Sequence, residues 1–328
     1  MQYHHLTLDE RERIAKMKTE GISTNKIAEA LGRSCSTITR EFHRNGSQKD
    51  YWPSQAQTQA DQRRLQSKSP WRMTSPALSR YVKKQLQQRH SPEQIAGRLR
   101  MDFPDNTEMR VSHSCLYQWI AAQKQQGRSW HTYLRQAHRK RRKRYGASES
   151  RGRIVGRVGI EKRPTVVDLK VRFGDWEGDT VEGAKGTGYL VSHVERKCYY
   201  TVLGLMPDKR SETLNRITRR SFRRHKGVPL ETITVDNGKE FAGHAQLSRQ
   251  LGVDIYFSQP YHAWERGINE NTNGLLRQFF PKGMDFRNLT TRQIRHVERL
   301  LNNRPRKALG YRTPLEVMQK IPDVALQN

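Results

Sequence analysis

The amino-acid sequence predicts a chain of several domains, in which all-α helix-turn-helix regions precede an α/β domain. Three observations support this fold class. Short amphipathic helices separated by glycine-containing turns fill the first part of the chain, up to residue 135. The composition then changes to Arg, Lys, Gly and Ser over residues 136–164. From residue 165, β-rich segments come first and alternating strands and helices follow, which is typical of a mixed sheet covered by helices.

These changes divide the chain into four predicted parts. They are a helix-turn-helix domain over 1–50, a helical region with a second helix-turn-helix over 51–135, a basic linker over 136–164 and an α/β domain over 165–328. A length of 328 residues suffices for two or three domains and leaves ample core for an enzyme domain.

The first three helices are predicted within residues 6–21, 23–32 and 33–45. Thr7 and Glu10 form a capping box at the start of the first helix. Four apolar side chains fall at helical spacing and can close one small core: Ile27, Leu31, Ile38 and Phe42. The tight glycine-containing turn before the third helix predicts a helix-turn-helix.

The third helix carries side chains that suit DNA bases and phosphates: Ser36, Thr37, Thr39, Arg40 and Arg44. The alternative is a basic surface on an ordinary helical bundle. We favour DNA binding, because the overall charge agrees with the motif.

Part of this pattern returns further along the chain. The segment STNKIAEAL at 23–31 aligns with SPEQIAGRL at 91–99, and a partner helix is predicted over 111–123. Candidate DNA contacts at the start of that helix are Ser112, His113, Ser114 and Tyr117. This arrangement predicts a second helix-turn-helix; the alternative is a helical hairpin that bridges two domains. Residues 136–164 are either a solvated linker or an arm that follows DNA phosphates.

Net charge is the strongest global signal. The formal net charge of +29 causes self-repulsion unless a polyanion neutralises it. Nucleic acid is therefore the expected partner, and a membrane surface is the alternative. No apolar run approaches the roughly 20 residues that span a bilayer. The basic residues are interspersed with the helix-turn-helix patterns and do not lie on one amphipathic face, so we expect no membrane partner.

The N-terminus and the cysteines indicate the compartment. The first residues lack the apolar core of a secretory signal. Cys35, Cys115 and Cys198 form no close pair, so they support neither a disulfide framework nor a cysteine-based zinc site. We expect a protein of the reducing cytoplasm.

The sequence predicts five strands and four helices in the α/β domain. Strands are predicted within 174–183, 188–195, 198–206, 231–238 and 253–260. Helices are predicted within 211–227, 244–252, 266–280 and 290–303. The first three strands form an antiparallel meander.

Acidic residues stand out in so basic a domain. Asp236 ends a predicted strand, which is where open α/β sheets bind ligands, although Asp-Asn-Gly is also good turn chemistry. Asp175, Glu177 and Asp179 are two apart and share one face of a strand, so they need solvent or a cation. Their spacing does not distinguish among the three.

A further carboxylate lies on the predicted helix 266–280. Glu270 and Arg277 fall opposite the apolar stripe of this helix, with Asn273 close by. This can be a plain solvent face, or a groove that holds a metal and a phosphate. Carboxylates that converge from separate elements are what two-metal phosphoryl transfer requires.

The chain resembles the DDE-type bacterial insertion-sequence transposases of the insertion sequence 30 family. The motifs that carry the resemblance span nearly the whole chain: STITREFHRN, WEGDTVEG, TVDNGKEFAGH, WERGINENTNGLLRQFFPKG and LNNRPRKALGYRTPLEV. Thirty-three residues separate Asp236 from Glu270, a spacing typical of these transposases and of retroviral integrases. Arg277 lies seven residues after Glu270, where that wider group carries Lys or Arg.

The resemblance implies a ribonuclease-H-like, integrase-type catalytic domain with Asp179, Asp236 and Glu270 as catalytic and metal-binding carboxylates. It implies two Mg²⁺ ions, with Mn²⁺ as a substitute, and phosphate contacts from Arg277 and Lys282. The implied function is binding of terminal inverted repeats followed by DNA cleavage and strand transfer. The implied partners are transposon-end and target double-stranded DNA, and a second copy in a homodimer or larger synaptic complex.

Two other functions compete with this one. A DNA-binding regulator with a degenerate catalytic fold would be expected to lose a carboxylate, whereas all three positions are intact. A metal-dependent nuclease that cuts without joining is not distinguished by sequence.

Overall fold

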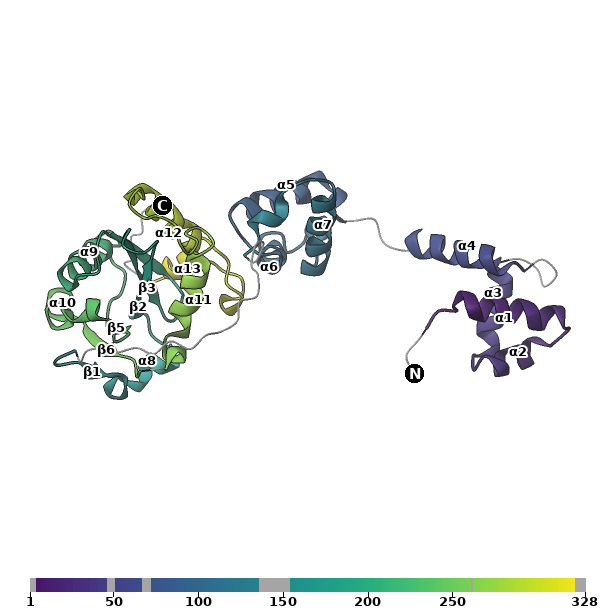
Figure 1. The fold of residues 1–328 in the computed structure, drawn as a ribbon, viewed down its shortest axis with the longest axis horizontal. Coiled ribbons are helices and arrows are strands. Elements are labelled where there is room, and N and C mark those ends of the chain that lie inside the picture. The colour runs from purple at the N-terminus through teal and green to yellow at the C-terminus, as the bar shows by residue number, and fades with distance from the viewer. Residues whose placement is uncertain (1–3, 46–50, 67–71, 136–153, 261, 322–328) are drawn as a thin grey trace. The chain divides into compact units, whose positions relative to one another are not determined.

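The computed structural model describes residues 4–45, 51–66, 72–135, 154–260 and 262–321 (Figure 1). The chain forms two compact units, Met1–Trp71 and Arg72–Asn328. The predicted boundary at residue 50 lies inside the first of them.

The first unit consists of α1 (Leu8–Thr19), α2 (Thr24–Ala30), α3 (Cys35–Asn45) and α4 (Pro53–Gln66). The capping box of Thr7 and Glu10 is confirmed, and α1 to α3 close a core that includes the fully buried Ile14, Ile27 and Ile38. The buried Arg11 helps to join α4 to this unit, as do the buried Ala56 and the bond from Arg63 of α4 to Asn45 of α3. The Arg11 guanidinium pairs with Glu41 of α3 at 2.7 Å and donates to Gln57 of α4 at 2.6 Å.

The second unit begins with a helical part made of α5 (Pro76–Gln87), α6 (Pro92–Asp102) and α7 (His113–Gln125). The two helices predicted from the repeated pattern are thus present. Ser91 and Ser112 cap α6 and α7, each by accepting a bond from a backbone N–H of the first turn. Leu86, Ile95 and Leu116 are fully buried in the shared core of this part.

A six-stranded sheet forms the rest of the unit. Its strands are β1 (Val158–Gly159), β2 (Asp175–Glu182), β3 (Tyr189–Glu195), β4 (Thr201–Met206), β5 (Thr232–Val235) and β6 (Asp254–Phe257). They lie in the order β1-β6-β5-β2-β3-β4. The predicted meander of β2, β3 and β4 is antiparallel, whereas β1, β6, β5 and β2 run parallel. The sheet is mixed, as predicted.

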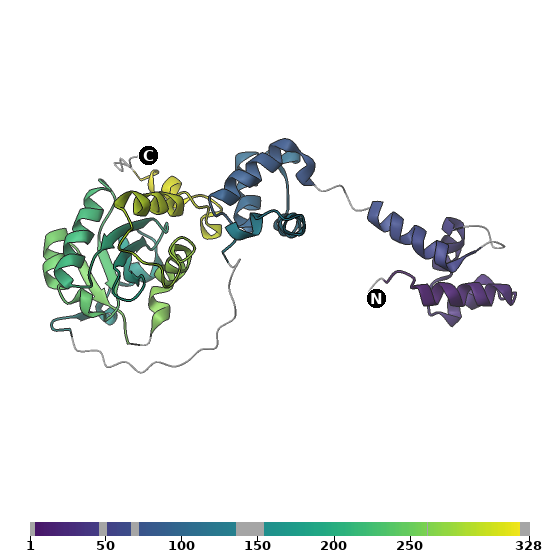
Figure 2. The same ribbon diagram turned by 45° about the horizontal axis from the view of Figure 1, so that its top comes forward.

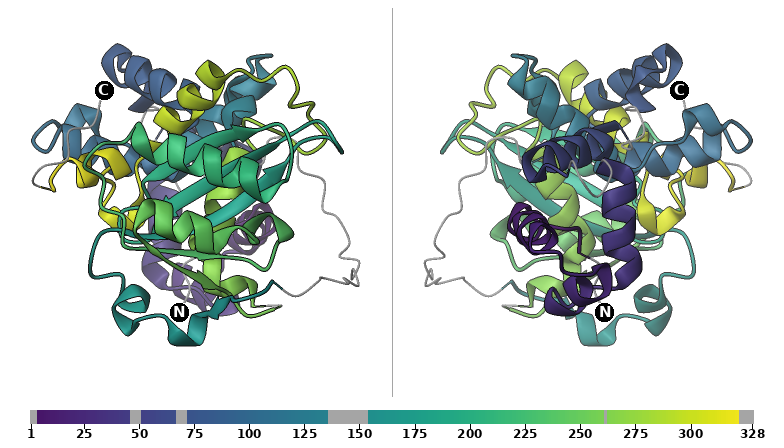
Figure 3. Two further views of the ribbon diagram at one scale, coloured as in Figure 1. Left: turned by 90° about the vertical axis from the view of Figure 1, so that its left-hand side faces the viewer. Right: turned by 90° about the vertical axis from the view of Figure 1, so that its right-hand side faces the viewer.

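Helices cover both faces of this sheet (Figures 1 and 3). On one face, α9 (Ser211–Arg223) and α10 (His244–Leu251) pack on a core that contains Trp176. On the other, α11 (Gly267–Leu276) and α12 (Thr291–Asn302) pack on Val181, Leu190 and Leu203. Two short helices, α8 (Thr165–Leu169) and α13 (Pro314–Met318), complete the domain.

The helical part contacts the C-terminal segment of the sheet domain (Figure 2). Arg98 of α6 donates two hydrogen bonds to the Glu316 carboxylate of α13, at 2.7 and 2.6 Å. Gln94 accepts from the buried Arg304 at 3.0 Å. A Cβ atom at Gly97 would overlap the ring of Tyr311, so only glycine allows α6 to approach this closely.

The predicted linker is described from residue 154 onward. There, β1 pairs in parallel with β6 and adds an edge to the sheet. Residues 136–153, where the phosphate-following arm is predicted, lie outside the described residues. Within the described ranges, no helix is both long and apolar enough to cross a membrane.

Candidate active site

Two neighbouring parallel strands bring Asp179 and Asp236 together. Glu177 of β2 is the register partner of Thr234 of β5. Continuing this register by two residues places Asp236 level with Asp179 and on the same face of the sheet. Both side chains are partly open to solvent, at 24% and 23% exposure. The pair therefore lies at the surface end of a buried sheet.

A guanidinium lies between these two carboxylates. One terminal nitrogen of Arg266, directly before α11, is 3.6 Å from Asp179 Oδ2, and the other is 3.7 Å from Asp236 Oδ2. The Arg266 side chain is 15% exposed, and its buried Nε has no hydrogen-bond partner among the described residues. One cation thus neutralises two like charges that would otherwise repel each other.

Backbone and amide donors fix the orientation of both carboxylates. Asp179 Oδ1 accepts from the Thr180 N–H at 2.8 Å, and its Oδ2 accepts from the Asn273 side chain of α11 at 2.8 Å. Asp236 Oδ1 accepts from the Gly238 N–H at 2.9 Å. The Asp-Asn-Gly turn therefore orients the aspartate as well as reversing the chain.

Burial raises the pKa of Asp179 to about 6, and the nearby carboxylates of Asp236 and Glu240 act in the same direction. Arg266 and the Thr180 N–H oppose this rise in pKa. A carboxylate that is poorly solvated and close to a second one is a favourable ligand for an additional cation.

The structure distinguishes the three acidic residues of β2. Asp175 is buried and pairs with Arg172 at 2.9 Å, while Glu177 is buried and pairs with Arg196 at 2.6 Å. Of the three, only Asp179 lies next to Asp236. The negative charges of Asp175 and Glu177 are therefore neutralised by arginines.

Glu270 lies in the first turn of α11, with an exposed side chain. It is three residues before Asn273, so the two side chains are neighbours on one side of the helix. Asn273 contacts Asp179, whereas the exposed Glu270 side chain lies one turn closer to the start of the helix. Within the described part of the chain, no group of three or more His, Cys, Asp or Glu side chains is close enough to hold a metal. The structure thus brings two of the three predicted carboxylates together and does not bring Glu270 into a metal-binding group with them.

Arg277 and Lys282, the two predicted phosphate contacts, follow at the end of α11. The Arg277 guanidinium donates to the backbone oxygen of Glu182 at 2.8 Å, and Lys282 is exposed in the turn that follows.

The predicted DNA-contacting side chains lie on solvent-facing parts of α3 and α7. On α3, Ser36, Thr39, Arg40 and Arg44 are exposed and Thr37 is half-buried. On α7, Ser112 serves as the helix cap, His113 and Ser114 are exposed, and Tyr117 is 46% exposed.

Sequence reasoning missed two members of the site. Arg266 is four residues before Glu270, a helical spacing that could have indicated it. Glu240 is buried, accepts from Thr180 Oγ1 at 2.7 Å and pairs with Lys209 at 3.1 Å. Its proximity depends on the turn after β5, which sequence spacing alone does not specify.

Two protein-family models match this chain, one in its first helical unit and one in its sheet domain. A family model described as a helix-turn-helix domain matches residues 2–45, which include α1 to α3. One described as an integrase core domain matches residues 172–263, which contain Asp179 and Asp236 but not Glu270.

Three curated relatives are similar along nearly the whole chain. The transposase for insertion sequence element IS4351 of Bacteroides fragilis is 41% identical, over 97% of this chain and 96% of that protein. The transposase for IS1086 of Cupriavidus metallidurans is 34% identical, over 98% and 96%. The transposase for IS30A of Escherichia coli is 34% identical, over 96% and 84%. Among solved structures, the catalytic core domain of BIV integrase aligns at 18% identity and a TM-score of 0.34, over 44% of this chain and 93% of that chain.

Proposed function

Because the chain belongs to the insertion sequence 30 family of transposases, we propose that it binds the terminal inverted repeats of its element and catalyses DNA cleavage and strand transfer with Asp179, Asp236 and Glu270. The observation that carries this proposal is the pair of aspartates held around one positive charge by β2 and β5. Two carboxylates this close repel each other, and a bound cation relieves that repulsion.

The side chains present fit a divalent metal. Two carboxylates with free lone pairs already face one cation, and Mg²⁺ prefers oxygen ligands, usually one or two carboxylates together with substrate phosphates. We assign Asp179, Asp236 and Glu270 to two Mg²⁺ ions, for which Mn²⁺ would substitute. When bound, the metal would lower the pKa of a water molecule and offset the negative charge that develops at phosphorus.

The protein's own residues position the carboxylates and the DNA. Thr180, Asn273 and Gly238 hold the two aspartates in place through the hydrogen bonds described above. The exposed Glu270 side chain can turn toward them from α11. Arg277 and Lys282 would contact phosphates next to the reacting one, which supplies charge and orientation but no nucleophile.

The reaction consists of two phosphoryl transfers. First, water attacks a phosphodiester at the end of the element; the bond to the 3′ oxygen breaks and leaves a 3′ hydroxyl. That hydroxyl then attacks a phosphodiester of the target, so that one P–O bond forms as another breaks. No external energy source and no covalent bond between protein and DNA are needed.

Binding to the DNA ends would come from the exposed face of α3 and from a second helix-turn-helix formed by α6 and α7. Each cleaved end must be brought to the target together with the other. We therefore expect a homodimer or larger synaptic complex to act on the DNA.

A strand-transfer assay with purified protein, Mg²⁺ or Mn²⁺, a fragment with both element ends and a target plasmid tests this proposal. Asp179→Asn, Asp236→Asn and Glu270→Gln should each abolish joined products while end binding is retained. Glu265→Gln, which alters the other glutamate beside α11, is the matched control and should remain active. Cleavage without joining would favour the nuclease, and specific binding without chemistry would favour the regulator.

A further inference from the structure

We propose that the cavity between α12 and the segment after α11 binds an unpaired nucleotide of a DNA strand, with its base on the phenylalanines and its phosphates on the arginines of α12. This inference rests on the proposed function, because it requires DNA to be the substrate. The cavity has a volume of about 730 Å³, within the range of small-ligand sites. A nucleobase with its sugar fits such a space.

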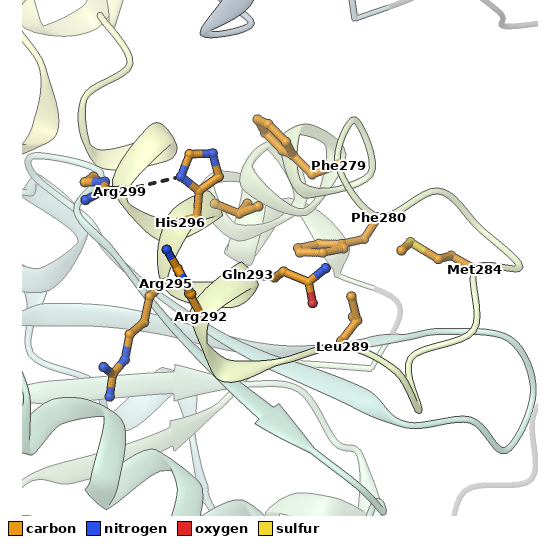
Figure 4. Close-up of a pocket in the computed structure, with 10 residues that line it drawn as sticks. Phe279, Phe280, Met284, Leu289, Arg292, Gln293, Arg295, His296 and Arg299 are labelled. Atoms are coloured by element: carbon orange, nitrogen blue, oxygen red, sulfur yellow. Dashed lines mark hydrogen bonds between the residues drawn. The ribbon is translucent and has the colours of Figure 1, made fainter.

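One wall of the cavity is apolar (Figure 4). Phe280 is almost fully buried and belongs to the core between the sheet and α12. Phe279 and Met284 pack against this core but keep part of their surface open to the cavity. A flat aromatic surface next to solvent is where a nucleobase can stack.

The opposite wall is basic. Arg292, Arg295 and Arg299 follow one side of α12 at spacings of three and four residues, and all three are exposed. In the described part of the chain none of them pairs with a carboxylate, and the Arg299 guanidinium lies 3.3 Å from His296 Nδ1 (Figure 4). Guanidinium groups without a counter-charge are the groups that bind phosphate most readily.

The acidic residue of the same helix does not reach this wall. Glu298, three residues after Arg295, is buried against the sheet, where it accepts from the Leu203 N–H of β4 at 2.6 Å and pairs with Arg224 at 3.6 Å. Some arginines of the unit are neutralised by carboxylates, for example Arg196 by Glu177 and Arg98 by Glu316. The three arginines of the α12 stripe have no such partner among the described residues, so their charge is available to a phosphate.

The position of the cavity suits a strand that enters the candidate active site. The helix α11 carries Glu270 in its first turn and ends at Leu276, just before the phenylalanines. Six residues of helix span about 9 Å, which is about three base steps of B-DNA. A strand that places a phosphate at the carboxylates would thus reach the cavity about three nucleotides away.

An unpaired nucleotide explains both walls, whereas an intact duplex explains only one. A duplex would place phosphates on the arginines but keep its base faces stacked away from Phe279. Aromatic rings combined with basic side chains are typical of single-strand binding, in which bases stack on the rings.

The test is a binding measurement with the full chain and no divalent metal, so that failure of the proposed chemistry does not affect it. The probes are a short duplex with an unpaired thymidine tail carrying one 2-aminopurine, and the same duplex with the tail paired. Phe279→Leu, which keeps an apolar side chain but removes the ring, should weaken binding of the tailed probe on the order of tenfold. It should also remove the 2-aminopurine fluorescence change, while affinity for the paired probe stays the same.

The basic wall is tested with Arg292→Gln/Arg295→Gln. Loss of two phosphate contacts should reduce the slope of log affinity against log salt by about 1.4 for the tailed probe. The matched control is Arg220→Gln/Arg223→Gln on α9, which covers the opposite face of the sheet; it should leave the preference for the tail unchanged.

Two results would overturn the proposal. One is an equal response of both probes to Phe279→Leu. The other is a change of sedimentation mass in the arginine double variant without DNA, because the groove would then be an interface between copies of the chain.

Discussion

Replacing the aspartate that is most strongly perturbed should stabilise the protein while it abolishes the reaction. Burial raises the pKa of Asp179 to about 6 from an ordinary value of 3.8. The unfolded chain is therefore ionised at this position from about pH 4 upward, whereas the folded chain keeps a proton up to about pH 6. The free energy of unfolding falls across that interval, and above pH 6 the full difference applies.

The magnitude follows from the size of the shift in pKa. Slightly over two pH units corresponds to about 3 kcal/mol at about 1.36 kcal/mol per unit. Asp179→Asn removes the charge and should increase the free energy of unfolding by up to about 3 kcal/mol at pH 8. The gain is reduced because the Asn273 amide, which donates to Asp179 and accepts from Ser192, must turn to suit an amide neighbour.

Denaturant unfolding of the full chain in EDTA, at pH 8 and at pH 4, measures this gain. The gain should be largest at pH 8. It should be close to zero at pH 4, because the side chain at position 179 is then uncharged in both the folded wild type and the folded variant. Asp208→Asn is the control, since hydrogen bonds from Arg210 and Thr213 lower the pKa of Asp208 and no gain is expected there. Destabilisation by Asp179→Asn at pH 8, or an equal gain at both pH values, would refute the reasoning.

Three further predictions concern other contacts. Arg266→Gln removes the cation between the aspartates, so the pKa of Asp179 should rise further, as measured by NMR titration. Ca²⁺ should also raise the thermal midpoint of this variant more than that of the wild type, as measured by thermal scans without DNA. The absence of either effect would contradict the prediction. DNA binding should weaken on the order of 10³-fold from 50 to 200 mM salt if about six phosphates are contacted, and Arg40→Gln should reduce the salt slope by about 0.9; a flat response in a filter-binding titration would contradict this. Glu316→Gln should destabilise the attachment of α6 to the sheet domain by about 1 kcal/mol or less, because the pair of Glu316 with Arg98 is partly exposed. Amide hydrogen exchange in α6 should therefore become faster, and an unchanged exchange rate would argue against the contact.

The sequence predicted five of the six strands of the sheet and its four longest helices, because each of these carries a local signal; β1, α8 and α13, which are two to five residues long, were not predicted. The capping residues, the terminating glycines and the alternation of apolar residues act over a few positions, and the predicted strands and helices are confirmed. The mixed sheet also follows from their order along the chain.

Contacts between residues far apart in the sequence could not be predicted from such local signals. The role of Glu177 depends on Arg196, which lies in the turn between β3 and β4, whereas the Arg172 that pairs with Asp175 is only three residues away along the chain. Arg266 reaches both aspartates only because α11 packs on β2 and β3. The extension of the first unit to α4 likewise rests on contacts between distant segments, such as those of the buried Arg11 with Glu41 and Gln57. The assignment of Glu270 as third carboxylate stays a prediction.

The contact between α6 and the C-terminal segment has a consequence for where DNA is cut. Arg98 with Glu316, and Gly97 against Tyr311, fix α6 to the body that carries Asp179. If α7 reads a base sequence, the distance from that sequence to the cleaved bond is set by packed side chains. The number of residues between 136 and 153 then has no influence on that distance. The helical part and the sheet domain together would thus hold a fixed distance between the recognised sequence and the cleaved bond. If the recognised sequence of an element end were moved by one base pair, the cut would also move by one base pair.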